Sequence, residues 1–344
     1  MYNVFSLIFL LALVPANSIR LTEITSDQNY GTWQKFTRFV DTEKGSQVKG
    51  LSDLKVYLQF FGYLSNDPTK NLTDLYDEEM ESAVSAYQKN MGLPVSGELD
   101  NDTMNLIIAP RCGNPDKIIV STNNSIASIL HYSFLKNTPM WKRQIPITLK
   151  YAFSPDHMIP ELSVSEIRPV FERAFERWSS ATSINFAETD DLRHADISIG
   201  FYTGNHGDTL PFDGPLGMTA HAYPPETGII HLDGAEIWAV DSEKLKLKRA
   251  VDLESVALHE IGHVLGLGHS TINEAVMYPT LISGTRKVEL SVDDVEGIQG
   301  LYGSNRSKHD FQNSSWSTLQ GLRRSSGSSM ILGIMVFLVY LRLL

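Results

Sequence analysis

The segment "HEIGHVLGLGH", residues 259–269, holds three of the ten histidines of this 344-residue chain. The residues before it, from Asp252 onward, have helical apolar spacing, so His259 and His263 lie on one face of a helix. Gly266 and Gly268 are residues that end a helix and allow a sharp turn. The segment therefore predicts a helix followed by a turn that returns His269 to the other two histidines.

Three imidazoles placed in this way can hold one metal ion and leave a fourth coordination position open, as in a catalytic zinc site. Glu260 follows His259 directly and can approach the open position without binding the metal. A carboxylate at that position can act as a general base toward water. We therefore expect His259, His263 and His269 to bind catalytic zinc and Glu260 to be the catalytic base.

Further motifs accompany this segment: "PRCGNPD" (110–116), "HGDTLPFDGPLGMTAHA" (206–222), "EAVMYPT" (274–280) and "LSVDDVEGIQGLYG" (290–303). Together they resemble the matrix metalloproteinases, the matrixin family of the metzincin clan, over residues 47–303. The short layout with a hydrophobic tail resembles the plant matrixins. The resemblance implies a zinc metalloendopeptidase acting on proteins or peptides, with Met277 in the methionine turn below the zinc.

The fold implied by the resemblance is an α/β (α+β) zincin-like catalytic domain with a twisted mixed sheet and an active-site helix. The residue pattern agrees, because short strands alternate with helical segments between residues 140 and 303. Three helical segments between residues 47 and 109 predict a small three-helix prodomain. Residues 117–145 lack periodicity and are expected to form an exposed linker.

Cys112 is the only cysteine, so the chain has no internal disulfide framework. Such a thiol is commonly an inert buried group, but in matrixins the cysteine of this motif is the switch that keeps the zymogen latent. The resemblance implies that Cys112 fills the fourth zinc position, since a thiolate is a good zinc ligand. Arg111 and Asp116 could pair and hold the loop, and Asn114 replaces the apolar residue usual in the family.

The resemblance implies two further groups of metal ligands and a specificity pocket. A structural zinc would be held by four residues with no vacant position: His206, Asp208, His221 and His231. Calcium would be bound by carboxylates and carbonyls: Asp213, Gly214, Leu216, Met218, Asp233 and Glu236. Asp196 would belong to a second calcium site, beside a segment that is shortened here. Leu258, Pro279 and Leu281 would line the pocket beside the zinc, which should favour an apolar side chain.

The two ends of the chain carry apolar runs. Residues 1–18 are expected to be a signal peptide, since an apolar stretch ends in a small-x-small cleavage pattern. Residues 304–344 are expected to be a linker and a hydrophobic tail. The tail resembles a GPI-attachment signal, with attachment at Asn313 or Ser325, and a C-terminal membrane helix is the alternative. The intervening regions are assigned to the prodomain (19–130) and the catalytic domain (131–303).

These ends predict an extracellular, membrane-anchored protein. Five sequons for N-glycosylation agree with secretion: Asn71, Asn101, Asn123, Asn305 and Asn313. The net charge of −11 makes nucleic acid an improbable partner. A different class of function remains open at this point, a catalytically weak extracellular or cell-wall binding protein, because the three-helix unit resembles peptidoglycan-binding domains.

Overall fold

The computed structural model describes residues 32–67, 69, 71–116, 131–135, 137–144 and 146–304. The expected signal peptide and hydrophobic tail lie outside these residues, as do Asn123, Asn305, Asn313 and Ser325. Within the described part, no helix combines the length and the apolar character needed to cross a membrane.

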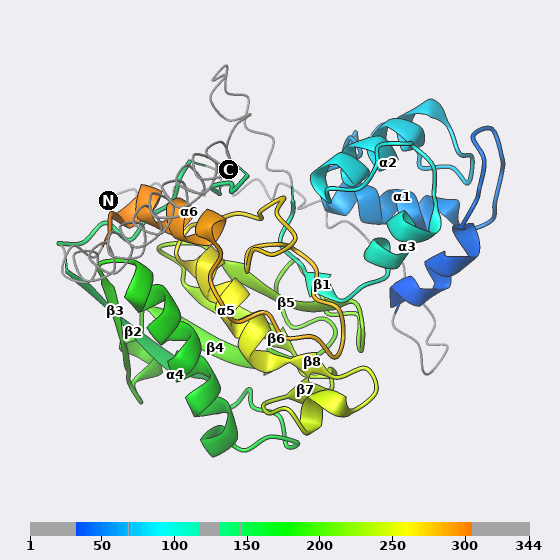
Figure 1. Cartoon of the computed structure of the whole chain (residues 1–344). Coiled ribbons are helices and arrows are strands. Elements are labelled where there is room, and N and C mark those ends of the chain that lie inside the picture. Colours follow the sequence, from blue (N-terminus) through cyan, green and yellow to red (C-terminus); the bar gives the residue numbers. More distant parts are fainter. Residues whose placement is uncertain are drawn as a thin grey trace, which may run out of the picture.

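The N-terminal unit is the predicted three-helix bundle, preceded by a 3-10 helix that the sequence did not predict (Figure 1). Its helices are η1 (Thr32–Phe39), α1 (Leu51–Phe60), α2 (Glu78–Asn90) and α3 (Asn101–Ile107). Asp77 and Asp100 cap α2 and α3 by accepting hydrogen bonds from backbone N–H groups. The aromatic rings of Trp33, Tyr57 and Phe61 pack edge to face inside the bundle.

The second unit is built on a six-stranded mixed sheet with the order β1-β5-β6-β4-β2-β3. Only β5 and β6 pair antiparallel, and the other neighbours are parallel. The strands are β1 (Arg111–Cys112), β2 (Ile147–Phe153), β3 (Ile184–Glu188), β4 (Ile197–Tyr202), β5 (Met218–Tyr223) and β6 (Ile229–Asp233). A separate parallel pair is formed by β7 (Trp238–Ala239) and β8 (Val251–Asp252). The mixed sheet expected from the sequence is therefore confirmed.

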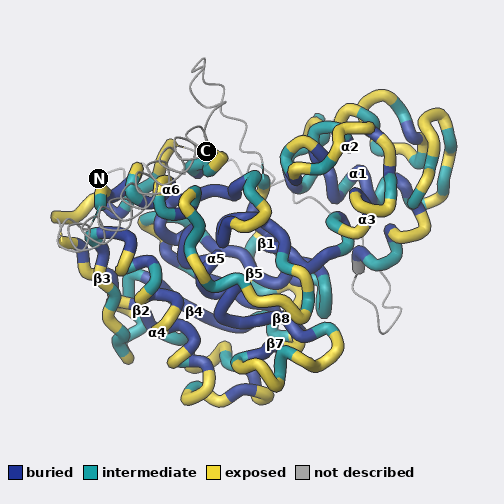
Figure 2. Tube along the Cα trace, in the orientation of Figure 1, coloured by how far each residue is buried: buried dark blue, intermediate teal, exposed yellow. Residues whose placement is uncertain are grey.

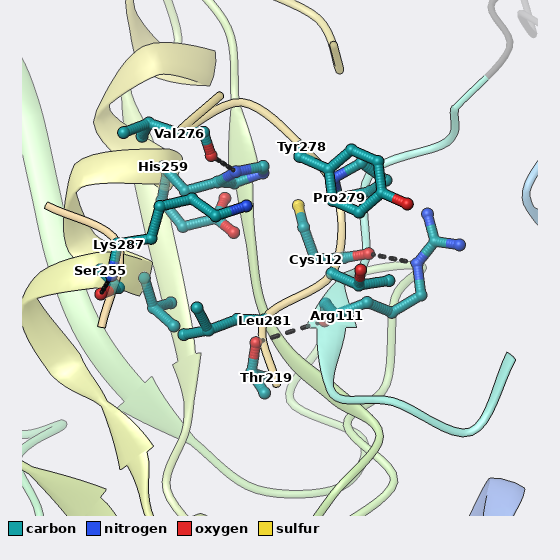
Figure 3. Close-up of a pocket in the computed structure, with 13 residues that line it drawn as sticks. Arg111, Cys112, Thr219, Ser255, His259, Val276, Tyr278, Pro279, Leu281 and Lys287 are labelled. Atoms are coloured by element: carbon teal, nitrogen blue, oxygen red, sulfur yellow. Dashed lines mark hydrogen bonds between the residues drawn. The ribbon is translucent and has the colours of Figure 1, made fainter. Parts of the chain in front are cut away.

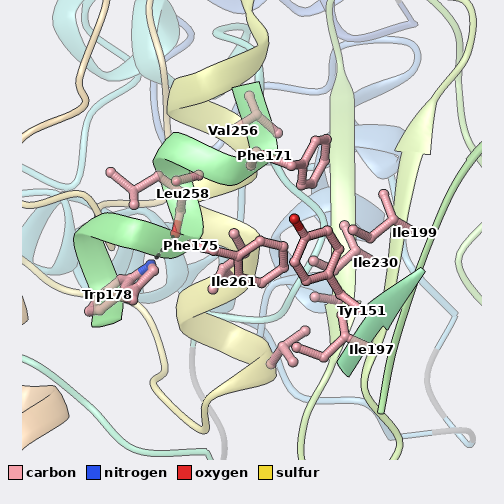
Figure 4. Close-up of a cluster of buried hydrophobic side chains, with 14 of the residues drawn as sticks. Tyr151, Phe171, Phe175, Trp178, Ile197, Ile199, Ile230, Val256, Leu258 and Ile261 are labelled. Atoms are coloured by element: carbon pink, nitrogen blue, oxygen red, sulfur yellow. Dashed lines mark hydrogen bonds between the residues drawn. The ribbon is translucent and has the colours of Figure 1, made fainter. Parts of the chain in front are cut away.

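Helices α4 (Val164–Ala181) and α5 (Leu253–Val264) cover one face of the sheet (Figures 1 and 4). Their inner faces and the sheet form the core, in which Trp178 is fully buried. The Trp178 indole donates a hydrogen bond to Leu258 O at 2.8 Å and so ties α4 to α5. The remaining elements are α6 (Val292–Tyr302) and two short 3-10 helices, η2 (Leu192–His194) and η3 (Lys244–Lys246).

The expected exposed linker is wrong for its second half. Residues 131–135 run beside the turn after α5, with an antiparallel bridge between Phe134 and Leu267. Trp141 is buried, and its indole donates to Val264 O at 3.0 Å. The sequence could not indicate this docking, because single apolar side chains such as Trp141 pack here without a periodic pattern. Residues 131–144 therefore belong to the catalytic unit.

Candidate active site and metal centres

Helix α5 carries two of the three histidines and is buried over its whole length (Figure 2). Asp252 caps its start by accepting a hydrogen bond from the Ser255 N–H at 2.8 Å. Gly266 follows its end with φ near +105°, and a Cβ there would lie 2.2 Å from Pro139 O. Only glycine fits this backbone, which turns the chain so that His269 faces α5.

The three imidazoles converge on one point. His263 Nε2 lies 3.1 Å from His259 Nε2 and 3.2 Å from His269 Nε2. Each Nδ1 points outward to an acceptor: Val276 O at 2.7 Å for His259, Leu267 O at 2.8 Å for His263, and Asp116 Oδ1 at 2.8 Å for His269. Burial lowers the pKa of all three imidazoles, which keeps them neutral.

This geometry fits a bound cation. A carbonyl oxygen only accepts, so Nδ1 of His259 and of His263 carries the proton and the Nε2 atoms present lone pairs to one another. Three lone pairs at such distances repel unless a positive ion lies between them. The spacing agrees with tetrahedral zinc, whose nitrogen ligands at about 2.1 Å would be about 3.4 Å apart. The residues present could therefore hold zinc.

Cys112 completes the group. Its Sγ lies 3.4 Å from His263 Nε2, and the four donor atoms lie within 4.8 Å of one another. Burial, followed by the charge of Glu260, raises the pKa of the Cys112 thiol. A zinc ion would oppose both effects and favour the thiolate, as metal coordination does for thiols.

The chain around Cys112 lies between two backbone segments of the catalytic unit. On one side, the N–H groups of Arg111 and Gly113 donate to Gly217 O at 3.0 Å, just before β5, and to Ala220 O at 2.7 Å, within β5. On the other side, Cys112 N–H donates to Pro279 O at 2.9 Å. Strand β1 is thus the edge strand of the sheet and lies between β5 and the segment after the methionine turn.

Asn114, the residue that departs from the family motif, extends this pairing with its side chain. Its Nδ2 donates to Ala222 O at 2.9 Å, and its Oδ1 accepts from the Ala222 N–H at 3.0 Å. The carboxamide therefore takes the place of a peptide group beside β5.

Glu260 is fully buried beside this centre. Among the described residues, neither of its carboxylate oxygens has a hydrogen-bond partner. Burial raises its pKa to about 8, and the Cys112 thiol counteracts part of that rise. A buried carboxylate with free acceptor sites is suited to bind a water or take a proton.

A pocket opens between α5 and the segment 276–281, with Arg111 and Cys112 closing one end (Figure 3). Pro279 and Leu281 line it, as expected. Leu258 does not line it but lies in the hydrophobic core (Figure 4), because its position on α5 faces α4. Lys287, which the sequence did not single out, lines the pocket, and its Nζ donates to Asn273 O at 2.5 Å.

Met277 packs directly beneath α5. A Cβ on Gly262 would lie 2.3 Å from Met277 Sδ, so the helix and the turn touch at a residue without a side chain. The turn is fixed by Asp294, whose carboxylate accepts from the N–H groups of Val276 and Met277 at 2.8 and 3.0 Å. Asp294 also forms the capping box of α6 with Ser291. No pattern in the sequence indicates that Asp294 supports both the methionine turn and the start of α6.

The second set of histidines also converges. Asp208 Oδ2 lies 2.9 Å from His206 Nε2, 2.8 Å from His221 Nε2 and 3.0 Å from His231 Nδ1. All four donor atoms lie within 4.8 Å of one another. Burial opposes ionisation of Asp208, but the Leu210 N–H and the histidines lower its pKa. Three imidazoles and one carboxylate could hold a structural zinc with no open position.

Three buried carboxylates, those of Asp213, Asp233 and Glu236, influence one another near the loop before β5. Burial raises the pKa of Asp213 to about 7, of Asp233 to about 6 and of Glu236 to about 8. Asp233 accepts from the Gly214 N–H at 3.1 Å, and Glu236 accepts from the Leu216 N–H at 2.8 Å. Beside burial, the charge of Asp233 raises the pKa of Asp213, and the charges of Asp233 and Asp213 raise that of Glu236. Buried carboxylates that repel one another in this way could take a hard cation such as calcium.

Asp196, which the resemblance implied for a second calcium site, is bound to protein groups in the structure. Its carboxylate pairs with the Arg143 guanidinium and accepts from the Lys150 N–H at 2.7 Å. Despite partial burial, the hydrogen bond from Arg143 lowers the pKa of Asp196. The charge that calcium would need is already compensated by an arginine.

Comparison with known proteins gives two matching families. Residues 140–303 match the matrixin family, and residues 47–107 match the peptidoglycan-binding domain family. The chain is 48% identical to Metalloendoproteinase 1-MMP of Arabidopsis thaliana over 84% of its own length and 78% of that protein. The chain belongs to the matrixin family.

Other matrixins of similar layout include two further plant proteins. Metalloendoproteinase 4-MMP of Arabidopsis thaliana is 49% identical over 77% of this chain and 75% of that protein. Metalloendoproteinase 1 of Glycine max is 43% identical over 78% of this chain and 87% of that protein. As a matrixin with an N-terminal prodomain, the chain is a zinc metalloendopeptidase that uses zinc and calcium. These matches do not favour the alternative of a catalytically weak binding protein.

Proposed function

We propose that this matrixin is a secreted, latent endopeptidase whose reaction depends on Glu260 and on zinc held by His259, His263 and His269. The observation that carries the proposal is the convergence of three Nε2 lone pairs beside a buried carboxylate with no hydrogen-bond partner among the described residues. Structural zinc is assigned to His206, Asp208, His221 and His231. Calcium is assigned to the Asp213, Asp233 and Glu236 carboxylates, with Gly214, Leu216 and Met218 supplying carbonyls.

The mechanism follows from what each side chain can do. Zinc, when bound, polarises the carbonyl of the scissile peptide bond and lowers the pKa of a bound water to about 7. Glu260 takes the proton of the attacking water and later gives it to the leaving amine. The pocket beside Pro279 and Leu281 receives a substrate side chain and so orients the bond. The Nδ1 contacts of His259 with Val276 O and of His263 with Leu267 O hold these two imidazoles in place.

Latency in this proposal has two components. The Cys112 thiolate takes the position that water needs, and β1 takes the space where a substrate backbone would pair with β5 and Pro279 O. Removing the prosegment frees the position for water and the space for the substrate backbone. Residues 131–135 are paired with the turn after α5, so activating cleavage is assigned to residues 117–130, upstream of that ladder.

The extracellular location is part of the same proposal. It rests on the apolar N-terminal run, on the sequons and on the C-terminal tail, which we assign to a GPI anchor at Asn313 or Ser325. Asn71 and Asn101 are exposed, so both could accept a glycan. Enzymatic deglycosylation, and release from membranes by a phosphatidylinositol-specific phospholipase, test these assignments separately.

The catalytic assignment is tested by comparing the activated wild type with Glu260→Ala on a quenched fluorescent peptide. We expect the variant to retain zinc and its folded-state circular dichroism, and to lose activity by several orders of magnitude. A chelator should abolish the activity of the wild type. If Glu260→Ala cleaves the peptide at the wild-type rate, Glu260 has no part in the chemistry.

A further inference from the structure

The three zinc-site histidines differ in what holds their outward nitrogens. His259 and His263 donate to the carbonyls of Val276 and Leu267, which belong to the catalytic unit. His269 Nδ1 lies 2.8 Å from Oδ1 of Asp116, which belongs to the prosegment. Both side chains are almost completely buried, with exposed fractions of 1% and 0%. One ligand of the active site is therefore oriented by a carboxylate that leaves on activation.

Asp116 is surrounded by hydrogen-bond donors, the Arg111 guanidinium, the Tyr63 hydroxyl and the His269 ring, as an ionised carboxylate would be. Asp116 forms a buried ion pair with Arg111, and its Oδ2 accepts from Tyr63 OH at 2.6 Å. An ionised carboxylate only accepts hydrogen bonds, so the proton between Asp116 and His269 lies on Nδ1. His269 Nε2 is then left with its lone pair facing the other imidazoles.

The prodomain core fixes the place of this carboxylate. The Arg111 guanidinium lies 3.5 Å from the centroid of the Phe61 ring and donates to Tyr57 OH at 3.2 Å. Both aromatic rings belong to the α1 region, whose packing is that of a folded bundle. A chain of direct contacts thus runs from the α1 aromatics through Arg111 and Asp116 to His269.

We propose that Asp116 is a positioning residue for catalytic zinc, acting through His269 and only while the prosegment is in place. A carboxylate that accepts from the outer nitrogen of a ligating histidine fixes its tautomer and orientation and makes the inner nitrogen a stronger ligand. The prosegment then contributes two groups to the zinc site, the Cys112 thiolate and the Asp116 carboxylate. Activation removes both, so the active enzyme holds its catalytic zinc less tightly than the zymogen. This inference rests on the proposed zinc role of the three histidines.

The test is zinc competition by a chromophoric chelator on the uncleaved full-length protein, comparing wild type with Asp116→Asn. The histidine and aspartate group around Asp208 serves as an internal control, since it lies on other elements and should release its zinc identically in both proteins. We expect Asp116→Asn to weaken binding at the catalytic site alone by about 10- to 100-fold. A downfield imidazole N–H proton resonance from His269 should be present in the wild type and shifted upfield in the variant.

Arg111→Gln provides the matched variant, because it breaks the ion pair of Asp116 but keeps the carboxylate that faces His269 and its hydrogen bond from Tyr63 OH. If Asp116 only fastens the loop, both variants will lose zinc affinity equally and the inference is wrong. If the carboxylate acts on His269, the loss will be larger in Asp116→Asn, and the resonance will persist in Arg111→Gln. Equal zinc affinity in wild type and Asp116→Asn would also overturn the inference. Absence of zinc from the three histidines would instead overturn the proposed function itself.

Discussion

At the scale of single residues, the active centre depends on a few side chains whose orientations are fixed by their hydrogen bonds and their burial. Each Nε2 faces the others because each Nδ1 already has an acceptor. Glu260 is buried without a hydrogen-bond partner among the described residues, a costly arrangement that a fold retains only for a reason. Sequence spacing alone indicated that His259 and His263 face one point, since two residues of a helix at i and i+4 share one face. It did not indicate the burial of Glu260, which depends on the prosegment and the segments packed around α5.

Cys112→Ser tests latency at this scale. A serine hydroxyl is a far weaker zinc ligand than a thiolate, so only the backbone contacts of β1 would keep the prosegment in the cleft. The uncleaved variant should therefore cleave peptides measurably, but more slowly than the cleaved wild type. The measurement is the initial rate of peptide cleavage with the prosegment shown intact by mass spectrometry. A variant that stays latent would mean that β1 blocks the cleft without help from the thiol.

At the scale of elements, the contact between α5 and the methionine turn leaves no space for a side chain. Gly262→Ala would place a Cβ 2.3 Å from Met277 Sδ and 3.0 Å from the Trp178 ring. Overpacking of this kind costs about 1–3 kcal/mol, so we expect lower stability to urea together with weaker zinc binding. Both are measured on the full-length protein.

Gly300→Ala is the matched control for that substitution. Gly300 lies in α6, and its nearest contact for a new Cβ is Phe134 Cζ at 3.4 Å, an ordinary van der Waals distance. The helix should gain up to about 1 kcal/mol from the alanine. If Gly262→Ala is no less stable than Gly300→Ala, the close packing of helix and turn is not a constraint.

The helices and strands differ in how well the sequence predicts them. Helix α5 was predictable because its cap, its periodicity and its terminal glycines all agree. Strand β1 is two residues long and exists only because β5 and the segment after the methionine turn flank it, so no local pattern indicates it. The orientation of Leu258, the place of Lys287 and the docking of Trp141 likewise depend on tertiary neighbours.

At the scale of the whole molecule, the two units share a buried boundary. Tyr278 of the catalytic unit donates to Met91 O at 3.1 Å, and it packs with the prodomain core. Cations should stabilise the catalytic unit because its carboxylates near β5 are buried close together. The contribution of these carboxylates to the free energy of unfolding also depends on pH.

In calcium-free protein, we expect the melting temperature to fall between pH 5 and pH 8. The folded-state pKa values of Asp213, Asp233 and Glu236, about 7, 6 and 8, exceed the ordinary values. Stability gained from their protonation is complete below about pH 4 and is lost as pH rises through 6 to 8. Calcium replaces the protons, so it should raise the melting temperature more at pH 8 than at pH 5, by about 5–10 °C at saturation.

Scanning calorimetry with calcium, with magnesium and with neither measures this effect. Asp213→Asn should lose most of the calcium response, because it removes one charge of the site. An equal calcium shift at both pH values would contradict the assignment of these carboxylates.

The central claim is that one zinc ion is held by three imidazoles and, in the latent protein, by the Cys112 sulfur. Zinc X-ray absorption spectroscopy on the uncleaved protein with both zinc sites filled tests it most directly. We predict about one sulfur at about 2.3 Å for every two zinc ions, with nitrogen and oxygen ligands at about 2.0–2.1 Å. In Cys112→Ser the sulfur shell should vanish while the zinc content is unchanged. Uncleaved wild-type protein with full zinc and no sulfur shell would contradict the account.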